Sequence, residues 1–132
     1  MNRRRRHSSI ATDKYAFVFA GFDINADPTD SIERLALTAE NDSQGNAKPR
    51  KWEAFTLPGL TPRAYPMMAK ISDTHVLVIG GFKGGWLSDG IIFNSETLKI
   101  RSSVNSGVGF TCKGNPHVVT QKGTIIAVIE DP

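Results

Sequence analysis

The chain has 132 residues, which predicts a single domain, because domains typically hold about 100 to 200 residues. Hydrophobic residues make up 39% of the chain and charged residues 22%, a composition that supplies a core and argues against disorder or a collagen-like fibre. The longest apolar runs, VLVIG at 76–80 and IIAVI at 125–129, are far shorter than the about 20 residues of a membrane span. A soluble protein is therefore expected.

Basic charge is concentrated at the start of the chain. Lys and Arg number 16 against 13 Asp and Glu, a net charge of +3, and four of these cations are the consecutive residues Arg3 to Arg6. Without them, 16 − 4 = 12 cations face 13 acids, so the rest of the chain carries a net charge of −1 and no nucleic-acid-binding surface across the fold is predicted. Residues 1–6 form a basic N-terminal segment that can bind nucleic acid or anionic lipid, carry a nuclear address, or simply stay solvated.

The chain has a single cysteine, Cys112, which cannot form an intrachain disulfide. The charged N-terminus is not followed by an apolar stretch, so no secretory signal is predicted. Both features indicate an intracellular protein, most simply a cytoplasmic one, and Arg3 to Arg6 leave a nuclear location open.

The basic segment also suggests a regulatory site. Arg5 and Arg6 stand three and two positions before Ser8, a spacing that resembles the substrates of basophilic kinases. The acidic clefts of such kinases pair with guanidinium groups, so Ser8 or Ser9 is an expected phosphorylation site. The alternative is that HSSIAT at 7–12 forms a strand that hides both serines.

Ten short segments rich in β-branched, aromatic and aliphatic residues predict strands in an all-β protein. In chain order they lie at 7–12, 15–21, 30–37, 51–55, 65–71, 75–81, 89–94, 98–102, 116–121 and 124–129. The segment 38–50 is polar and contains Gly and Pro, and it is predicted to be an exposed loop.

The predicted strands recur with a period of about 50 residues. A shift of 60 superimposes Val18 on Val78, and the ten extra residues fit in the exposed loop. A shift of 50 superimposes 66–79 on 116–129 without a gap, which equates Val78 with Val128. Two complete units of four strands and the first half of a third unit are therefore predicted.

Several residues of these units resemble the kelch motif family. They comprise Trp52, Arg63, the double glycine Gly80–Gly81 and its degenerate counterpart Ala20–Gly21. The chain departs from the motif at Ile100, near the place where a tryptophan is expected, and at Glu130–Asp131, where the glycine pair is expected.

The resemblance implies a kelch-repeat domain over residues 7–132, made of four-stranded antiparallel β-propeller blades. The first blade would span about 7–57, the second about 62–104, and a half blade about 110–132. The expected fold is an incomplete propeller of two full blades plus a half blade. A β-sandwich of eight to ten strands is the alternative, but it does not explain the 50-residue register.

A closed propeller needs at least about four blades, or about 200 residues at this period. The chain is therefore not expected to close alone. It is expected to be a piece of a longer reading frame, to associate with copies of itself, or to be completed by another chain, because a half blade leaves a strand edge and an apolar face uncovered.

The residues that carry chemistry do not form a recognisable catalytic or metal-binding pattern. Of the three histidines, His7 and His117 both align with Met67 in the repeat, which makes them architectural, and no metal or cofactor is predicted. Galactose-oxidase-like enzymes share the kelch architecture but need Tyr, Cys and His copper ligands, and only Tyr15, Tyr65 and Cys112 are available. An enzyme is the less favoured alternative, which metal analysis of the purified protein would test.

Strand directions place three loops, 22–29, 59–65 and 83–88, at one end of the predicted sheets. This end would present Asp23, Asn25, Arg63, Tyr65, Lys83 and Trp86. Arg, Tyr and Trp are enriched in interface hot spots, so the sequence predicts a noncatalytic scaffold that binds another protein here. For Arg63 the alternative is a structural role, because Arg3 stands sixty positions earlier and suggests that this arginine belongs to the repeat.

Overall fold

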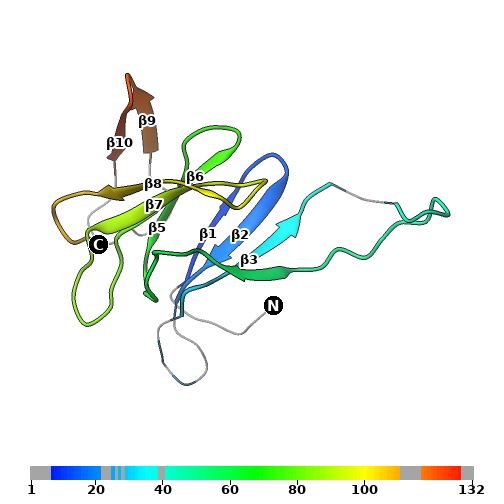
Figure 1. The fold of residues 1–132 in the computed structure, drawn as a ribbon, viewed down its shortest axis with the longest axis horizontal. Coiled ribbons are helices and arrows are strands. Elements are labelled where there is room, and N and C mark those ends of the chain that lie inside the picture. Colours follow the sequence, from blue (N-terminus) through cyan, green and yellow to red (C-terminus); the bar gives the residue numbers. More distant parts are fainter. Residues whose placement is uncertain are drawn as a thin grey trace.

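We describe the protein from a computed structural model, which places residues 7–21, 25, 27, 29–38, 41–110 and 117–128, apart from the side chains of residues 117, 127 and 128. The described residues form ten strands (Figure 1): β1 (Ser8–Ala11), β2 (Tyr15–Phe19), β3 (Ser31–Ala36), β4 (Glu53–Thr56), β5 (Met67–Lys70), β6 (His75–Ile79), β7 (Asp89–Asn94), β8 (Ile100–Asn105), β9 (His117–Gln121) and β10 (Thr124–Val128). Each predicted strand overlaps one of them, which confirms the all-β class. None of the described residues is helical, so this part of the chain contains no helix able to cross a membrane.

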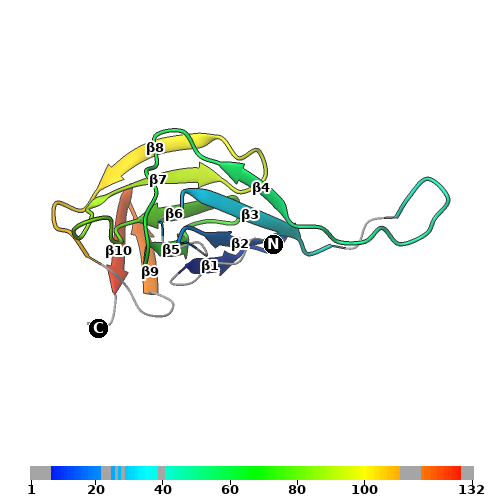
Figure 2. The same ribbon diagram turned by 90° about the horizontal axis from the view of Figure 1, so that it is seen from below.

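The strands form three antiparallel sheets in which neighbours along the chain are neighbours in space. β1 to β4 make the first sheet, β5 to β8 make the second sheet, and β9 and β10 form a hairpin. The four-stranded sheets match the two predicted four-strand units, and within the described residues no sheet closes into a ring. In both views the loop between β3 and β4 projects far from the sheets (Figure 2), and residues 43–50 are exposed, as predicted.

The second sheet is covered on both faces. On one face Val76, Val78 and Phe93 share a buried cluster with Phe17 and Phe19 of the first sheet, and the rings of Phe17 and Phe93 meet edge to face at 5.5 Å. The opposite face packs under the hairpin, in a cluster of Met67, Ala69, Leu77, Ile79 and Ile92 with Val118 and Ile125. Coverage of both faces explains why β6 is a continuous apolar run. The sheets are stacked in series, unlike a two-layer sandwich, in which each sheet buries one face.

The backbone takes the same path at the ends of β2 and β6. Gly80 and Gly81 have φ angles of 74° and 103°, and their predicted counterparts Ala20 and Gly21 have φ angles of 61° and 95°. Left-handed backbone costs a residue with a side chain roughly 1–2 kcal/mol, so Ala20 adopts it against its own preference. This agreement confirms the correspondence between the two strand ends.

The strand pairing corrects one detail of the predicted repeat. Val78 pairs with Met68, and the residue that pairs with Val118 in the hairpin is Ala127. Ala127 is therefore the counterpart of Val78, and the ungapped register was wrong by one residue. The reason is that β9 and β10 are joined by the two-residue turn Lys122–Gly123, one residue shorter than the connection between β5 and β6.

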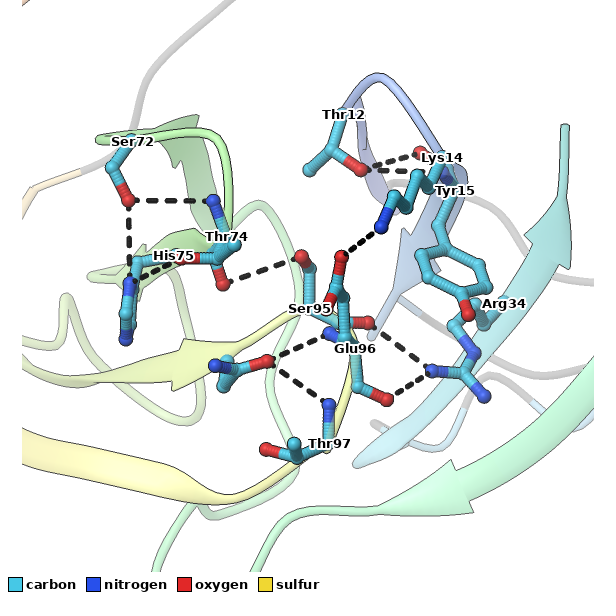
Figure 3. Close-up of polar contacts among 11 residues, drawn as sticks. Thr12, Lys14, Tyr15, Arg34, Ser72, Thr74, His75, Ser95, Glu96 and Thr97 are labelled. Carbon is cyan, nitrogen blue, oxygen red and sulfur yellow. Dashed lines mark hydrogen bonds and ion pairs between the residues drawn. The ribbon is translucent and has the colours of Figure 1, made fainter.

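A polar junction joins the first and second sheets at the end where β1 turns into β2 (Figure 3). Arg34 on β3 lies over the ring of Tyr15 at 4.3 Å and donates hydrogen bonds of 3.1 and 3.0 Å to the carbonyl oxygens of Ser95 and Glu96, in the turn after β7. Lys14 pairs with Glu96 at 2.7 Å, and the hydrogen bond and charge of Glu96 raise the pKa of Lys14. One arginine thus fastens the β7–β8 turn to the neighbouring sheet.

We expect Arg34→Ala to lower the free energy of unfolding by about 1–3 kcal/mol, because it leaves the carbonyl oxygens of Ser95 and Glu96 without their donor. Lys14→Ala is the matched control, since it removes only a solvent-exposed ion pair at the same junction and should stay close to the wild type. Urea unfolding followed by circular dichroism measures both variants. Equal stability of the two would contradict the role given to Arg34.

Candidate partner-binding site at the loop end of the sheets

The loops at the other end of the sheets are hydrogen-bonded to one another. The amide of Gly21 donates to the carbonyl oxygen of Arg63 at 2.8 Å, and Ala64 and Phe82 exchange two backbone hydrogen bonds of 2.9 and 2.7 Å. The isolated bridge between Thr29 and Arg63 joins the same segments. The two ends of the first loop, Gly21 and Thr29, therefore lie beside the loops 59–65 and 83–88, and residues 22–24, 26 and 28 lie outside the described residues.

A fourth loop, 106–110, also belongs to this end and was not predicted. The amide of Gly81 donates to the carbonyl oxygen of Phe110 at 2.8 Å, and the amide of Phe110 donates to the carbonyl oxygen of Leu87 at 3.1 Å. A side chain at Gly109 would overlap the backbone of Trp86, so only glycine fits there. The fourth loop supports the segment 81–88 from one side.

Arg63 is buried at this end, with 0% of its surface exposed. Its guanidinium donates five hydrogen bonds, at 2.9 to 3.1 Å, to Thr61, to the carbonyl oxygens of Gly80 and Asp89, and to the Asp89 carboxylate. Arg63 fastens its loop to the ends of β6 and β7, so it cannot present its side chain to a partner. The prediction that Arg63 is part of the accessible surface was wrong, and the alternative structural role fits its contacts.

Three aromatic side chains, Tyr65, Phe82 and Trp86, form a cluster on these loops, which we call the aromatic cluster. The ring of Trp86 lies 5.2 Å from that of Phe82 and 6.4 Å from that of Tyr65, both in edge-to-face arrangements. Trp86 is nevertheless 55% exposed. The cluster therefore holds a large indole in a defined position with much of its surface open to solvent.

The backbone of Tyr65, one of the three residues of the aromatic cluster, is strained. Its φ angle is 53°, although it precedes Pro66 and such residues favour extended backbone. Left-handed backbone at a residue other than glycine costs of order 1–3 kcal/mol and is found preferentially at binding sites and switch regions. The strain orients a half-buried ring toward Trp86, which agrees with a binding role for this loop.

The other predicted contact residues are Lys83, Asn25 and Asp23. Lys83 is exposed in the turn that follows Phe82, where its amide donates to the carbonyl oxygen of Gly85 at 3.0 Å. Asn25 is exposed, and Asp23 lies outside the described residues. The structure thus brings together Tyr65 and Trp86 from the predicted set, adds Phe82 to them, and removes Arg63 from the accessible surface.

The histidines and serines singled out in the sequence lie elsewhere. The Nδ1 atom of His75 is hydrogen-bonded to the hydroxyls of Ser72 and Thr74, at 3.2 and 3.0 Å. Among the described residues no group of three or more His, Cys, Asp or Glu side chains is placed to hold a metal. On β1, Ser8 is half-buried and Ser9 is exposed, so Ser9 is the more accessible of the two expected phosphorylation sites.

No protein-family model matches the chain, and no curated protein matches it. The function is therefore inferred from the residues and geometry of the loop end.

Proposed function

We propose that this protein is a noncatalytic stack of kelch-type propeller blades that binds another protein through the aromatic cluster. Two four-stranded meanders packed in series and the shared left-handed backbone at Ala20–Gly21 and Gly80–Gly81 support the blade interpretation. The exposed loops at one end supply the binding surface, as is usual where rigid strands position variable loops.

The observation that carries the proposal is the 55% exposure of Trp86 while its ring is held by Phe82 and Tyr65. Tryptophan and tyrosine supply much of the energy at protein interfaces. A side chain that is already ordered loses little conformational entropy on binding, so its buried area is converted more fully into affinity. The neighbouring Lys83 is exposed and cationic, which favours a partner that places an apolar side chain beside a carboxylate.

The binding test does not require that the partner be identified. A random peptide library displayed on phage is selected on the full chain, and the enriched peptides are then titrated against the wild type and Trp86→Ala by calorimetry. We expect Trp86→Ala to weaken binding by roughly 30-fold, the loss that a hot-spot residue of about 2 kcal/mol gives.

Val119→Ala is the matched control, because Val119 is 58% exposed and lies on the hairpin, away from the loop end. It should bind the peptides as the wild type does. Peptides that bind Trp86→Ala and the wild type equally well would refute the proposed site.

A further inference from the structure

A long arm, residues 37–52, connects β3 to β4 and projects away from the sheets (Figures 1 and 2). The amide of Leu37 donates to the carbonyl oxygen of Lys14 at 2.8 Å, so the arm leaves the first sheet at the polar junction, at the end opposite the aromatic cluster. Connections of this length without strands or helices of their own are uncommon in compact domains, and they are usually either functional or disordered.

The tip of the arm is ordered by its own hydrogen bonds. Asn41 and Ala47 form an antiparallel bridge, and the amide of Asp42 donates to the carbonyl oxygen of Asn46 at 2.7 Å. The Asp42 carboxylate accepts hydrogen bonds from the amides of Gln44 and Asn46, each at 2.9 Å, as is typical of aspartate in turns. This self-contained turn favours a functional arm over a disordered one.

Below the tip, the two sides of the arm separate. The ladder between β3 and β4 ends at the pair Arg34–Glu53, and among the described residues the amides of Lys48, Arg50 and Lys51 have no hydrogen-bond partner. Pro49 has no N–H group, so it interrupts any ladder at this point. A pocket of about 160 Å³ opens there, and its lining consists of Ala36, Thr38, residues 48–51 and Glu53.

The lining of this pocket is cationic. Lys48, Arg50 and Lys51 are exposed, and among the described residues none of the three forms an ion pair. The acidic residue of the lining, Glu53, is paired with Arg34 at 3.1 Å, which offsets its charge. Three cationic side chains beside unpaired backbone amides are the groups that bind phosphate oxygens in proteins.

The size of the pocket and the charge around it define the ligand. At about 30 Å³ per water molecule the pocket has room for one anionic group, and it is smaller than the pockets that enclose whole small molecules. Without Arg3 to Arg6 and the three cations of the arm, 16 − 7 = 9 cations face 13 acids, a net charge of −4. A nucleic acid or an anionic membrane would be repelled by this charge, whereas a single phosphate group that reaches the arm would not.

We propose that the arm binds a phosphorylated segment of another protein, with its phosphoserine or phosphothreonine in this pocket. The phosphate group carries a charge of about −1.5 to −2 at pH 7 and accepts several hydrogen bonds. Arg50 supplies the planar fork that matches phosphate oxygens, and Lys48 and Lys51 add charge. Clusters of basic residues are a recurrent means of recognising phosphorylated peptides. The arm is separate from the aromatic cluster, so the inference does not rest on the proposed function.

A fluorescently labelled peptide library with a central phosphoserine between degenerate positions is the probe, and the same library with serine is the reference. In an anisotropy titration the full chain should bind the phosphorylated library at least about tenfold more tightly. Arg50→Ala should weaken this binding about tenfold or more, because it removes charge-assisted hydrogen bonds. Arg101→Ala is the matched control, since it removes the same charge from an exposed position on β8, and it should bind within about threefold of the wild type.

An NMR titration of the wild type with inorganic phosphate gives a second result that does not depend on a variant. The amide signals of Lys48, Arg50 and Lys51 should shift, and those of the loop 106–110 should not. Absence of these shifts, equal binding of the two libraries, or an equal loss in Arg50→Ala and Arg101→Ala would overturn the proposal.

Three further measurements separate the arm from other partners and from the basic N-terminal segment. A single-stranded oligonucleotide or phosphatidylserine vesicles that bind more tightly than the phosphorylated library, and that Arg50→Ala weakens, would make nucleic acid or membrane the partner and overturn the proposal. Replacing Arg3 to Arg6 by alanine should leave the binding of the phosphorylated library within about threefold of the wild type. Loss of binding in that variant would place the phosphate at the N-terminal segment instead.

Discussion

Arg63→Ala is expected to lower the free energy of unfolding by about 3–5 kcal/mol, which is a large fraction of the stability of a small domain. The guanidinium is buried, and its removal opens a cavity, leaves the carbonyl oxygen of Gly80 without its donor, and leaves the carbonyl oxygen of Asp89 with only the Gly80 amide as donor. Urea unfolding followed by circular dichroism measures the loss.

Two further variants make the Arg63 measurement specific. Arg63→Lys should recover little of the lost stability, because an ammonium group cannot reproduce the fork that reaches Thr61, Gly80 and Asp89 together. Arg50→Ala, at an exposed arginine, should change the stability by no more than about 0.5 kcal/mol. If Arg63→Ala cost no more than Arg50→Ala, the structural role of Arg63 would be wrong.

Gly81→Ala is expected to be the second costly substitution, with a loss of about 3 kcal/mol or more from backbone strain and steric overlap together. Gly81 has a φ angle of 103°, and a Cβ atom there would lie 2.5 Å from the carbonyl oxygen of Ala64 and 3.1 Å from the nitrogen of Pro66. The overlap would push the loop that carries Tyr65 away from the end of β6, so peptide binding at the aromatic cluster should weaken as well.

Gly84→Ala is the control for this substitution. Gly84 lies in the same loop and has a φ angle of 70°, but a Cβ atom there would meet nothing within 4 Å. Its cost should be limited to the roughly 1–2 kcal/mol of left-handed backbone. Thermal unfolding of both variants, with the same cost for each, would contradict the close packing at Gly81.

The strand positions were predictable because a short apolar run between turn residues is a strong local signal. The register of one repeat unit on another was harder to predict. A strand that is covered on both faces, such as β6, has no alternation of apolar and polar residues, so a one-residue slip between Val78 and Ala127 leaves its pattern unchanged. Only the different turn lengths of the two hairpins, which need the backbone, reveal the gap.

The candidate site was predictable in its location and only partly in its residues. Strand direction alone puts the three loops at one end. Charged residues usually lie on the surface, so the sequence predicts an exposed Arg63. Its burial depends on carbonyl oxygens at the ends of two other strands, which only the folded chain brings together. Phe82 and the loop 106–110 carried no signal of their own, because their contacts with Trp86 and Gly81 arise only in the folded chain.

Hydrogen–deuterium exchange of the full chain, with and without a peptide selected on it, tests the loop-end site most directly. Binding through the aromatic cluster predicts slower exchange in 61–66, 81–88 and 106–110, with no change in the turns at 12–15 and 94–98 at the opposite end. Protection confined to those opposite turns, with the loops around Trp86 exchanging as they do in the free chain, would contradict it.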